Sequence, residues 1–147
     1  MTLVSELPGR FCSIAAALEV VGDRWSLLAV REVSLGQHRF GEILEGTGAP
    51  RDRLSARLKA LVEADVLERR QYSDAPPRFD YHLTAAGKDL VPVLRSLMAW
   101  GDRWAVESPP VTLLHHDHEL KTTTVCGVCG ERVRGSDVHR QVNTPAG

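Results

Sequence analysis

The N-terminal two-thirds of the chain carries apolar side chains at the three- and four-residue spacing of amphipathic helices. Within residues 13–21 this spacing places Ile14, Leu18 and Val21 on one face. Gly22 follows as a typical helix stop. The same spacing predicts four further helices, at residues 24–36, 37–45, 50–64 and 85–106.

The junction between the third and fourth predicted helices has the composition of a helix-turn-helix. The segment Gly46–Pro50 ends one helix and begins the next, because proline at a first helical position loses only an N–H that has no partner there. In the fourth helix Leu54, Leu58 and Leu61 share one face, and polar residues occupy most of the other. This pattern predicts a helix that packs on its leucines and exposes a polar surface.

Period-two alternation replaces the helical spacing after this helix. Leu67–Tyr72 and Phe79–Leu83 are predicted as two strands, and the Ser-Asp-Ala-Pro-Pro segment between them is typical of a turn. Thr84 then suits the N-cap of the closing helix. The order of elements predicts a mainly α fold with a small β-hairpin, which is the winged helix-turn-helix arrangement.

The composition fits one globular domain with a short appendage, since the chain has 147 residues, of which 43% are hydrophobic and 25% charged. We expect a flexible arm over residues 1–10, a winged helix DNA-binding and dimerisation domain over 11–107, and a C-terminal tail over 108–147. The N-terminal residues lack the apolar core of a signal peptide, and no apolar stretch is long enough to span a membrane. A cytoplasmic location is therefore expected.

Charge indicates a nucleic-acid partner only locally, because the net charge of the whole chain is −1. The fourth predicted helix is basic, and a helix-turn-helix places the start of its second helix in the major groove. Arg51 and Arg53 are therefore expected to contact base edges, while Arg57 and the arginines of the hairpin are expected to reach phosphates. The candidate DNA-binding residues are Arg39, Arg51, Arg53, Ser55, Arg57, Lys59, Arg69, Arg70 and Arg78.

Motifs in unbroken order between residues 12 and 104 resemble the HxlR-type family of winged helix regulators. They are CSI at 12–14, GDRW at 22–25, RFGEI at 39–43, RLSARLKAL at 53–61, PPRFDY at 76–81, Leu83-Thr84, Gly87 and PVL at 92–94. The resemblance implies a winged helix that dimerises through its terminal helices and controls transcription by binding operator DNA. Arg24 is a mild departure, because the family usually has lysine there.

Oligomerisation and control rest on the terminal helices. The closing helix carries more apolar surface than a monomer of this size covers easily, so a homodimer is expected; its large apolar residues are Leu90, Leu94, Leu97, Trp100 and Trp104.

Cys12 begins the first helix, where some members of the family sense electrophiles or oxidants, and a helix N-terminus favours the thiolate. The alternatives are a packed, inert Cys12 and a small-molecule effector bound among Trp25, Trp100 and Trp104.

The tail contains two close pairs of metal-binding residues. They are His115 with His118 and Cys126 with Cys129. Each pair has the two-residue gap that lets neighbouring side chains reach one tetrahedral ion, so a structural Zn²⁺ is predicted. His116 or His139 is an alternative for either histidine. A redox-active or disulfide-bonded cysteine pair is the other interpretation.

An enzymatic function finds no support in the sequence, which contains neither a Gly-rich nucleotide loop nor a recognisable nucleophile motif. The alternative to a DNA-binding regulator is a winged helix that binds protein within a larger assembly. Such a module would favour an apolar or acidic recognition helix, whereas residues 51–59 are basic.

Overall fold

The computed structural model describes residues 6–10 and 12–143, which divide into two compact units, the first ending at Val106 and the second beginning at Glu107. Of the predicted arm, residues 1–5 lie outside the described residues.

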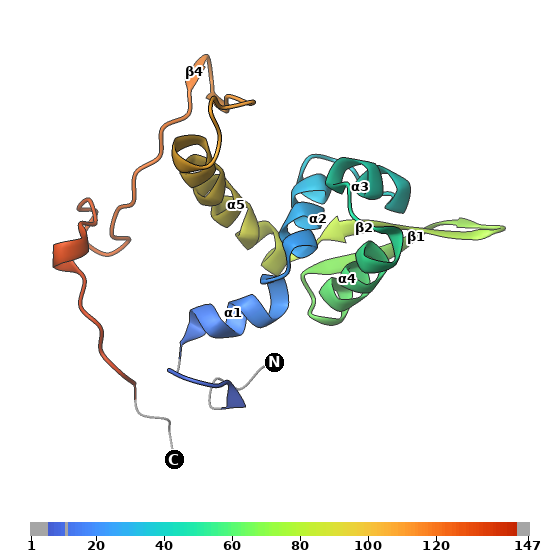
Figure 1. Ribbon diagram of the computed structural model, residues 1–147, viewed down its shortest axis with the longest axis horizontal. Helices are drawn as coiled ribbons and strands as arrows, with labels where there is room; N and C mark the ends of the chain where they lie inside the picture. Colours follow the sequence, from blue (N-terminus) through green and yellow to red (C-terminus); the bar gives the residue numbers. More distant parts are fainter. Residues whose placement is uncertain (1–5, 11, 144–147) are drawn as a thin grey trace. The chain divides into compact units, whose positions relative to one another are not determined.

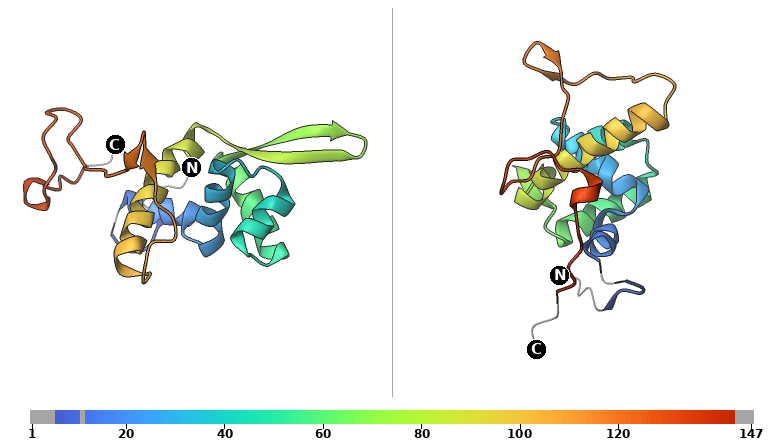
Figure 2. Two further views of the ribbon diagram at one scale, coloured as in Figure 1. Left: turned by 90° about the horizontal axis from the view of Figure 1, so that it is seen from above. Right: turned by 90° about the vertical axis from the view of Figure 1, so that its left-hand side faces the viewer.

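The first unit is a winged helix, so the predicted mainly α fold with one antiparallel hairpin is confirmed. The β1–β2 hairpin projects from the packed helices as the wing (Figures 1 and 2). The elements are α1 Ser13–Val21, α2 Arg24–Ser34, α3 Phe40–Thr47, α4 Arg51–Glu63, β1 Leu67–Asp74, β2 Pro77–Leu83 and α5 Ala85–Trp104.

The core of this unit lies between α2, α3, α4 and the start of β1. Leu54, Leu58 and Leu61 of α4 have no exposed surface, and Ile43 of α3 is equally buried. Burying one such side chain contributes roughly 1.5–3 kcal/mol. The leucine stripe of α4 therefore fixes which face of this helix meets solvent.

Thr84 attaches the start of α5 to the end of α4. Its hydroxyl accepts the N–H of Gly87 at 3.1 Å and donates to the carbonyl of Asp65 at 2.5 Å. A Cβ at Gly87 would stand 2.3 Å from the carbonyl oxygen of Val66, so only glycine allows this approach. The predicted N-cap of the closing helix is thus present.

Helix α3 begins at Phe40, so the prediction that it starts at residue 37 was wrong. The residues before Phe40 do not join the helix, because the carbonyl of His38 accepts the N–H of Tyr81 in β2 at 2.8 Å. Glu42 then accepts the N–H groups of His38 and Arg39 at 3.1 and 3.2 Å. These bonds cap the helix after the extended segment.

The apolar faces of α1 and α5 are only partly covered within the chain. Ile14 and Leu18 of α1 are 69% and 58% exposed, while Val21 is buried. In Figure 2, α1 and α5 lie at the end of this unit opposite the wing tip. The exposed large apolar residues of α5 are Val93, Leu97, Trp100 and Trp104.

The second unit has little regular structure. Its elements are β3 Leu114–His115, β4 His118–Glu119 and the short 3-10 helix η2 Gly135–Asp137. Between residues 107 and 143 every side chain is exposed except those of Leu120 and Cys126, which are partly buried. Across the described parts of both units, no helix combines the length and apolarity needed to cross a membrane.

Candidate nucleic-acid interface

A tight turn joins α3 to α4 and sets the angle between them. Gly48 has a φ of 68°, in the left-handed region that favours glycine, and its N–H donates to the carbonyl of Leu44 at 3.0 Å. Ala49 is buried, and the carbonyl of Pro50 accepts the first intrahelical bond of α4, from Leu54, at 2.9 Å. The predicted turn residues therefore form a helix-turn-helix.

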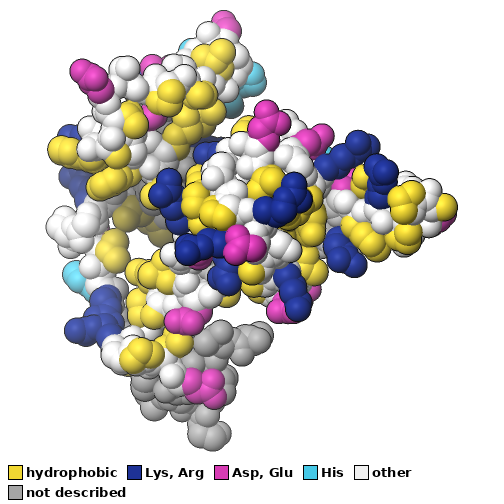
Figure 3. Space-filling view, turned by 45° about the vertical axis from the view of Figure 1, so that its right-hand side comes forward, with side chains coloured by type: hydrophobic (Ala, Val, Ile, Leu, Met, Phe, Trp, Pro, Cys, Tyr) yellow, Lys and Arg dark blue, Asp and Glu magenta, His cyan; other side chains and the backbone are white. Residues whose placement is uncertain are grey.

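The outward face of α4 carries the residues predicted to contact DNA. Arg51, Arg53, Ser55 and Lys59 are all exposed, and Arg57 is half-buried at the edge of the core. Asp52 is also exposed on the first turn, so the face is not uniformly basic. Figure 3 shows Lys and Arg side chains over the helices and at the base of the wing, with acidic and hydrophobic side chains between them.

Three of the candidate arginines stack on aromatic rings, an arrangement that was not predicted from the sequence. The pairs are Arg51 with Phe40 at 5.2 Å, Arg39 with Tyr72 at 4.8 Å and Arg69 with Phe79 at 4.0 Å from guanidinium carbon to ring centroid. Such contacts restrict a long side chain while leaving guanidinium N–H groups at the edge of the ring. Only the Arg69–Phe79 pair lies wholly within the wing, whereas the other two pairs join residues of different elements and have no local sequence signal.

The wing arginines lie on different faces of the hairpin. Arg69 pairs in register with Tyr81, and Arg70 with Asp80, so their side chains project to opposite sides. Arg70 forms a salt bridge with Glu68 on its own face. The charge of Arg70 is therefore partly compensated within the wing. Its predicted contact with a phosphate would have to compete with this salt bridge.

The strands extend further than predicted, to Asp74 and from Pro77. The pairing continues beyond a bulge between Gln71 and Ser73, with Ser73 opposite Arg78 and Asp74 opposite Pro77. Arg78 lies next to the tip of the wing and is exposed. This position keeps its side chain away from the helical core, as a backbone contact requires.

The base of the wing is fixed to the helices through two histidines. The Nδ1 atom of His38 lies 2.7 Å from the carbonyl oxygen of Tyr81, and its ring stacks on that of His82 at 4.3 Å. His82 in turn contacts Asp80 at 2.9 Å. These contacts hold the wing at a set position beside α3.

Cys12 occupies the N-cap position of α1, where its carbonyl accepts the N–H of Ala16 at 3.3 Å. The side chain is half-buried and its thiol is free. The structure therefore gives the predicted position of Cys12, and sensing by this thiol stays a prediction.

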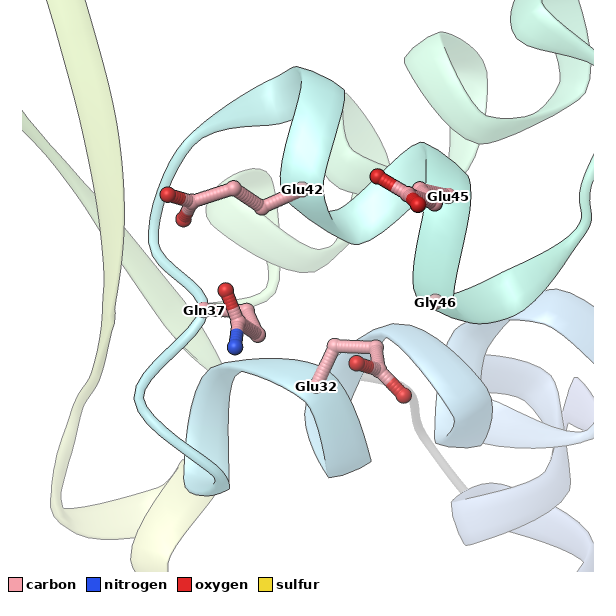
Figure 4. Close-up of a pocket in the computed structure, with 5 residues that line it drawn as sticks. All are labelled: Glu32, Gln37, Glu42, Glu45 and Gly46. Carbon is pink, nitrogen blue, oxygen red and sulfur yellow. The ribbon is translucent and has the colours of Figure 1, made fainter.

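A pocket between α2 and α3 is lined by carboxylates, not by the tryptophans proposed for an effector (Figure 4). Glu32 accepts a hydrogen bond from Nε of Arg31 at 2.8 Å, and Glu42 caps α3, so both carboxylates already serve the fold. Trp100 and Trp104 are 61% and 65% exposed. Neither tryptophan lines this pocket, and an effector site among the tryptophans stays a prediction.

The four predicted zinc ligands lie in two separate turns of the tail. His115 and His118 face each other across β3 and β4, whereas Cys126 and Cys129 share a later turn in which both thiols are free. No three metal-binding side chains stand together within residues 6–10 and 12–143. The backbone N–H groups of Cys129 and Val128 donate to the Cys126 sulfur, which lowers the pKa of that thiol.

The sequence of the chain is similar to those of transcriptional regulators. A profile of HxlR-like helix-turn-helix proteins matches residues 20–109. An uncharacterised HTH-type transcriptional regulator of Mycobacterium tuberculosis is 42% identical over 141 residues, which cover 92% of this chain and 89% of the relative. The chain belongs to the HxlR-like helix-turn-helix family. The resemblance derived from the sequence motifs is thereby confirmed.

Solved structures agree with this membership. The candidate transcription factor PA1607 superposes on the HxlR-like chain with a TM-score of 0.79 at 29% identity, covering 90% of this chain and 95% of PA1607. Reduced YodB of Bacillus subtilis, a transcriptional regulator, has a TM-score of 0.54 at 28% identity and covers 65% of this chain and 96% of its own. The chain is thus a transcriptional regulator of winged helix type.

Proposed function

We propose that the protein binds a pseudo-palindromic DNA operator as a homodimer, with α4 of each subunit in the major groove. The observation that carries this proposal is the orientation of α4. Its leucine face is completely buried, so Arg51, Arg53 and Lys59 must face outward beside the wing. A rigid helix that presents cationic side chains from its first turn has the geometry of direct base readout.

The candidate residues divide into base readers and phosphate contacts. Arg51 and Arg53 lie in the first turn of α4, which enters the groove first, and the stacking on Phe40 orients Arg51. Ser55 is exposed further along the same helix. We assign the half-buried Arg57, together with residues at the wing, to the phosphate backbone; the latter are Arg39, Arg69 and Arg78.

The homodimer is supported by the uncovered apolar faces at the end of the unit opposite the wing tip. Leu18 of α1 and Leu97 and Trp100 of α5 are all more than half exposed. Burial of these faces against their symmetry mates would form an isologous interface and leave both copies of α4 free for DNA. Half-sites separated by about one helical turn, or a multiple of it, follow from this arrangement.

We further propose that a redox or electrophile signal acts through Cys12. The thiol lies at the start of α1, next to the helix face assigned to the dimer. The similar YodB of Bacillus subtilis has been solved both after diamide treatment and with bound quinone. A small-molecule effector bound by the dimer is the second candidate signal.

The decisive experiment is recovery of bound DNA. Purified protein is mixed with fragmented DNA of random sequence, and the retained fragments are sequenced over successive rounds. We expect enrichment of an inverted repeat, protected symmetrically in footprinting. Fragments without a shared motif, or affinity that does not fall with rising salt, would contradict the proposal and favour a protein-binding module.

The signal is tested by comparing wild type with Cys12→Ser. Diamide or a quinone should release the operator from wild type and leave the serine variant bound. Ser13→Ala is the matched control, because Ser13 is the neighbouring residue at the start of α1 and has no thiol. Equal release from wild type and Cys12→Ser would exclude Cys12 as the sensor.

A further inference from the structure

The tail contains a cysteine turn, residues 124–133, which the regulatory function does not explain. A bridge between Val125 and Arg132 closes it, the N–H of Cys126 donates to the carbonyl of Glu131 at 2.8 Å, and the N–H of Gly130 donates to the carbonyl of Cys126 at 2.7 Å. Gly130 has a φ of 74°, which the tight return of the chain requires. The turn therefore holds two free thiols in one short loop.

A second turn, residues 113–120, presents two histidines in the same manner. His115 and His118 are directly paired across β3 and β4, and the N–H of Leu120 donates to the carbonyl of Leu113 at 2.8 Å to close the hairpin. Residues paired across antiparallel strands project to the same side. Their ring centroids are 5.6 Å apart. The hairpin thus presents two imidazoles on one side.

Neither turn has a hydrophobic core that would hold it. Leu114 and Val125 are 66% and 55% exposed, and Val128 is 97% exposed. Segments this small usually fold around a disulfide or a metal when their apolar burial is insufficient. Both turns are well formed and have metal-binding side chains at their tips, yet they bury no apolar residues. A bound metal would supply the stabilisation that apolar burial does not provide.

We propose that one Zn²⁺ joins the two turns of a single tail, bound by His115, His118, Cys126 and Cys129. The structure holds the two pairs apart. Only residues 121–123 separate the turns, so the site requires this short segment to bend until both pairs reach one ion. Binding displaces the two thiol protons, and two thiolates with two imidazoles complete a tetrahedral shell that suits zinc. Because this shell contains no open position, the ion is structural rather than catalytic.

The test uses full-length protein without an affinity tag, purified in the presence of a reductant. Elemental analysis is expected to find about one zinc per chain, as a closed four-ligand site requires. Replacement by Co²⁺ should give the visible absorption of a tetrahedral ion together with a thiolate charge-transfer band. X-ray absorption at the zinc edge should show two sulfur and two nitrogen ligands.

Four variants locate the site. Cys126→Ser with Cys129→Ser, and separately His115→Asn with His118→Asn, should each lose the zinc and the protection of the tail from limited proteolysis. The controls are Cys12→Ser, which removes the cysteine outside the tail, and His116→Asn, which removes a neighbouring histidine whose ring lies 4.2 Å from that of His115. Both controls should retain the zinc.

Several results would overturn the assignment. Half an equivalent of zinc bound by four sulfur ligands would place the ion between two chains instead of within one. Loss of zinc from His116→Asn would mean that the histidine pair is wrong. Metal-free wild-type protein, or a Cys126–Cys129 disulfide in protein kept under reductant, would exclude the zinc site altogether.

Discussion

The two units of the chain are stabilised in different ways. In the winged helix unit, Leu54, Leu58 and Leu61 are completely buried, and hydrogen-bonded caps such as Thr84 define the helix ends. In the tail, no residue between 107 and 143 is buried, and the ordered parts are short turns closed by backbone bonds. The first unit is therefore organised by apolar burial, whereas the second is organised by local turns around metal-binding side chains.

This difference determines where function can be assigned. A helix fixed by a buried core can present side chains to DNA in a set geometry, as α4 does. A tail without a core cannot position residues in this way unless a ligand orders it. We therefore assign DNA recognition to the first unit and a structural metal to the second, and the predictions below separate the two.

The largest expected effect is on stability. Leu58→Ala removes a fully buried side chain and should lower the free energy of unfolding by about 2–5 kcal/mol, measured by urea denaturation. Leu114→Ala in the tail is the matched control, since Leu114 is 66% exposed, and its cost should stay within about 0.5 kcal/mol. Similar losses for both variants would mean that the tail has a core of its own.

The second prediction concerns the dimer. Trp100 is 61% exposed on α5, and we expect Trp100→Ala to weaken self-association by about 2 kcal/mol or more, because buried tryptophans dominate interfaces. Sedimentation equilibrium measures this change. Val128→Ala is the control in the tail and should leave the dimer constant unchanged. A monomeric wild-type protein at micromolar concentration would contradict the proposed interface.

Third in size is the effect on base recognition. Arg53→Ala should cost about 1–3 kcal/mol of affinity for the selected operator, the value of one bidentate contact with a guanine, and less for random duplex. Fluorescence anisotropy with both DNAs measures the difference. Arg134→Ala removes an exposed arginine of the tail and should change neither affinity. Equal loss of affinity on both DNAs would show that Arg53 contacts phosphate.

The same contrast explains how much the sequence predicted. Helix α4 was predicted closely, from residue 50 to 64, because its leucine periodicity is a local pattern that the core then satisfies. The start of α3 was missed because it depends on the bond between His38 and Tyr81, which are far apart in the sequence. Local sequence patterns predict the elements that the core stabilises. They do not predict helix boundaries that depend on hydrogen bonds between residues far apart in the sequence.

For the candidate site, residue type and helical phase were sufficient to find the exposed arginines of α4. Cross-strand neighbours in the wing were not predictable in this way, because the pairing of Arg69 with Tyr81 and of Arg70 with Asp80 depends on strand register. In α1 the periodic face of Ile14 and Leu18 was assigned correctly, yet periodicity alone does not tell whether this chain or a second copy covers it. In the tail, the spacing of the histidines and cysteines indicates metal binding. It does not predict how the backbone folds between the two pairs.

The smallest expected effect distinguishes two arginines within the wing. Arg78 is exposed near the tip, and we assign it to a phosphate, so Arg78→Ala should weaken binding equally for operator and random DNA. The slope of log Kd against log salt should become shallower by about 0.9, the value for one lost phosphate contact on B-DNA. Arg70 is the matched comparison, because it shares a face of the wing with Arg78 and Glu68 already compensates its charge. Arg70→Ala should leave the salt slope nearly unchanged. If the two variants changed the slope equally, the salt bridge with Glu68 would have to open on DNA, and both arginines would contact phosphates.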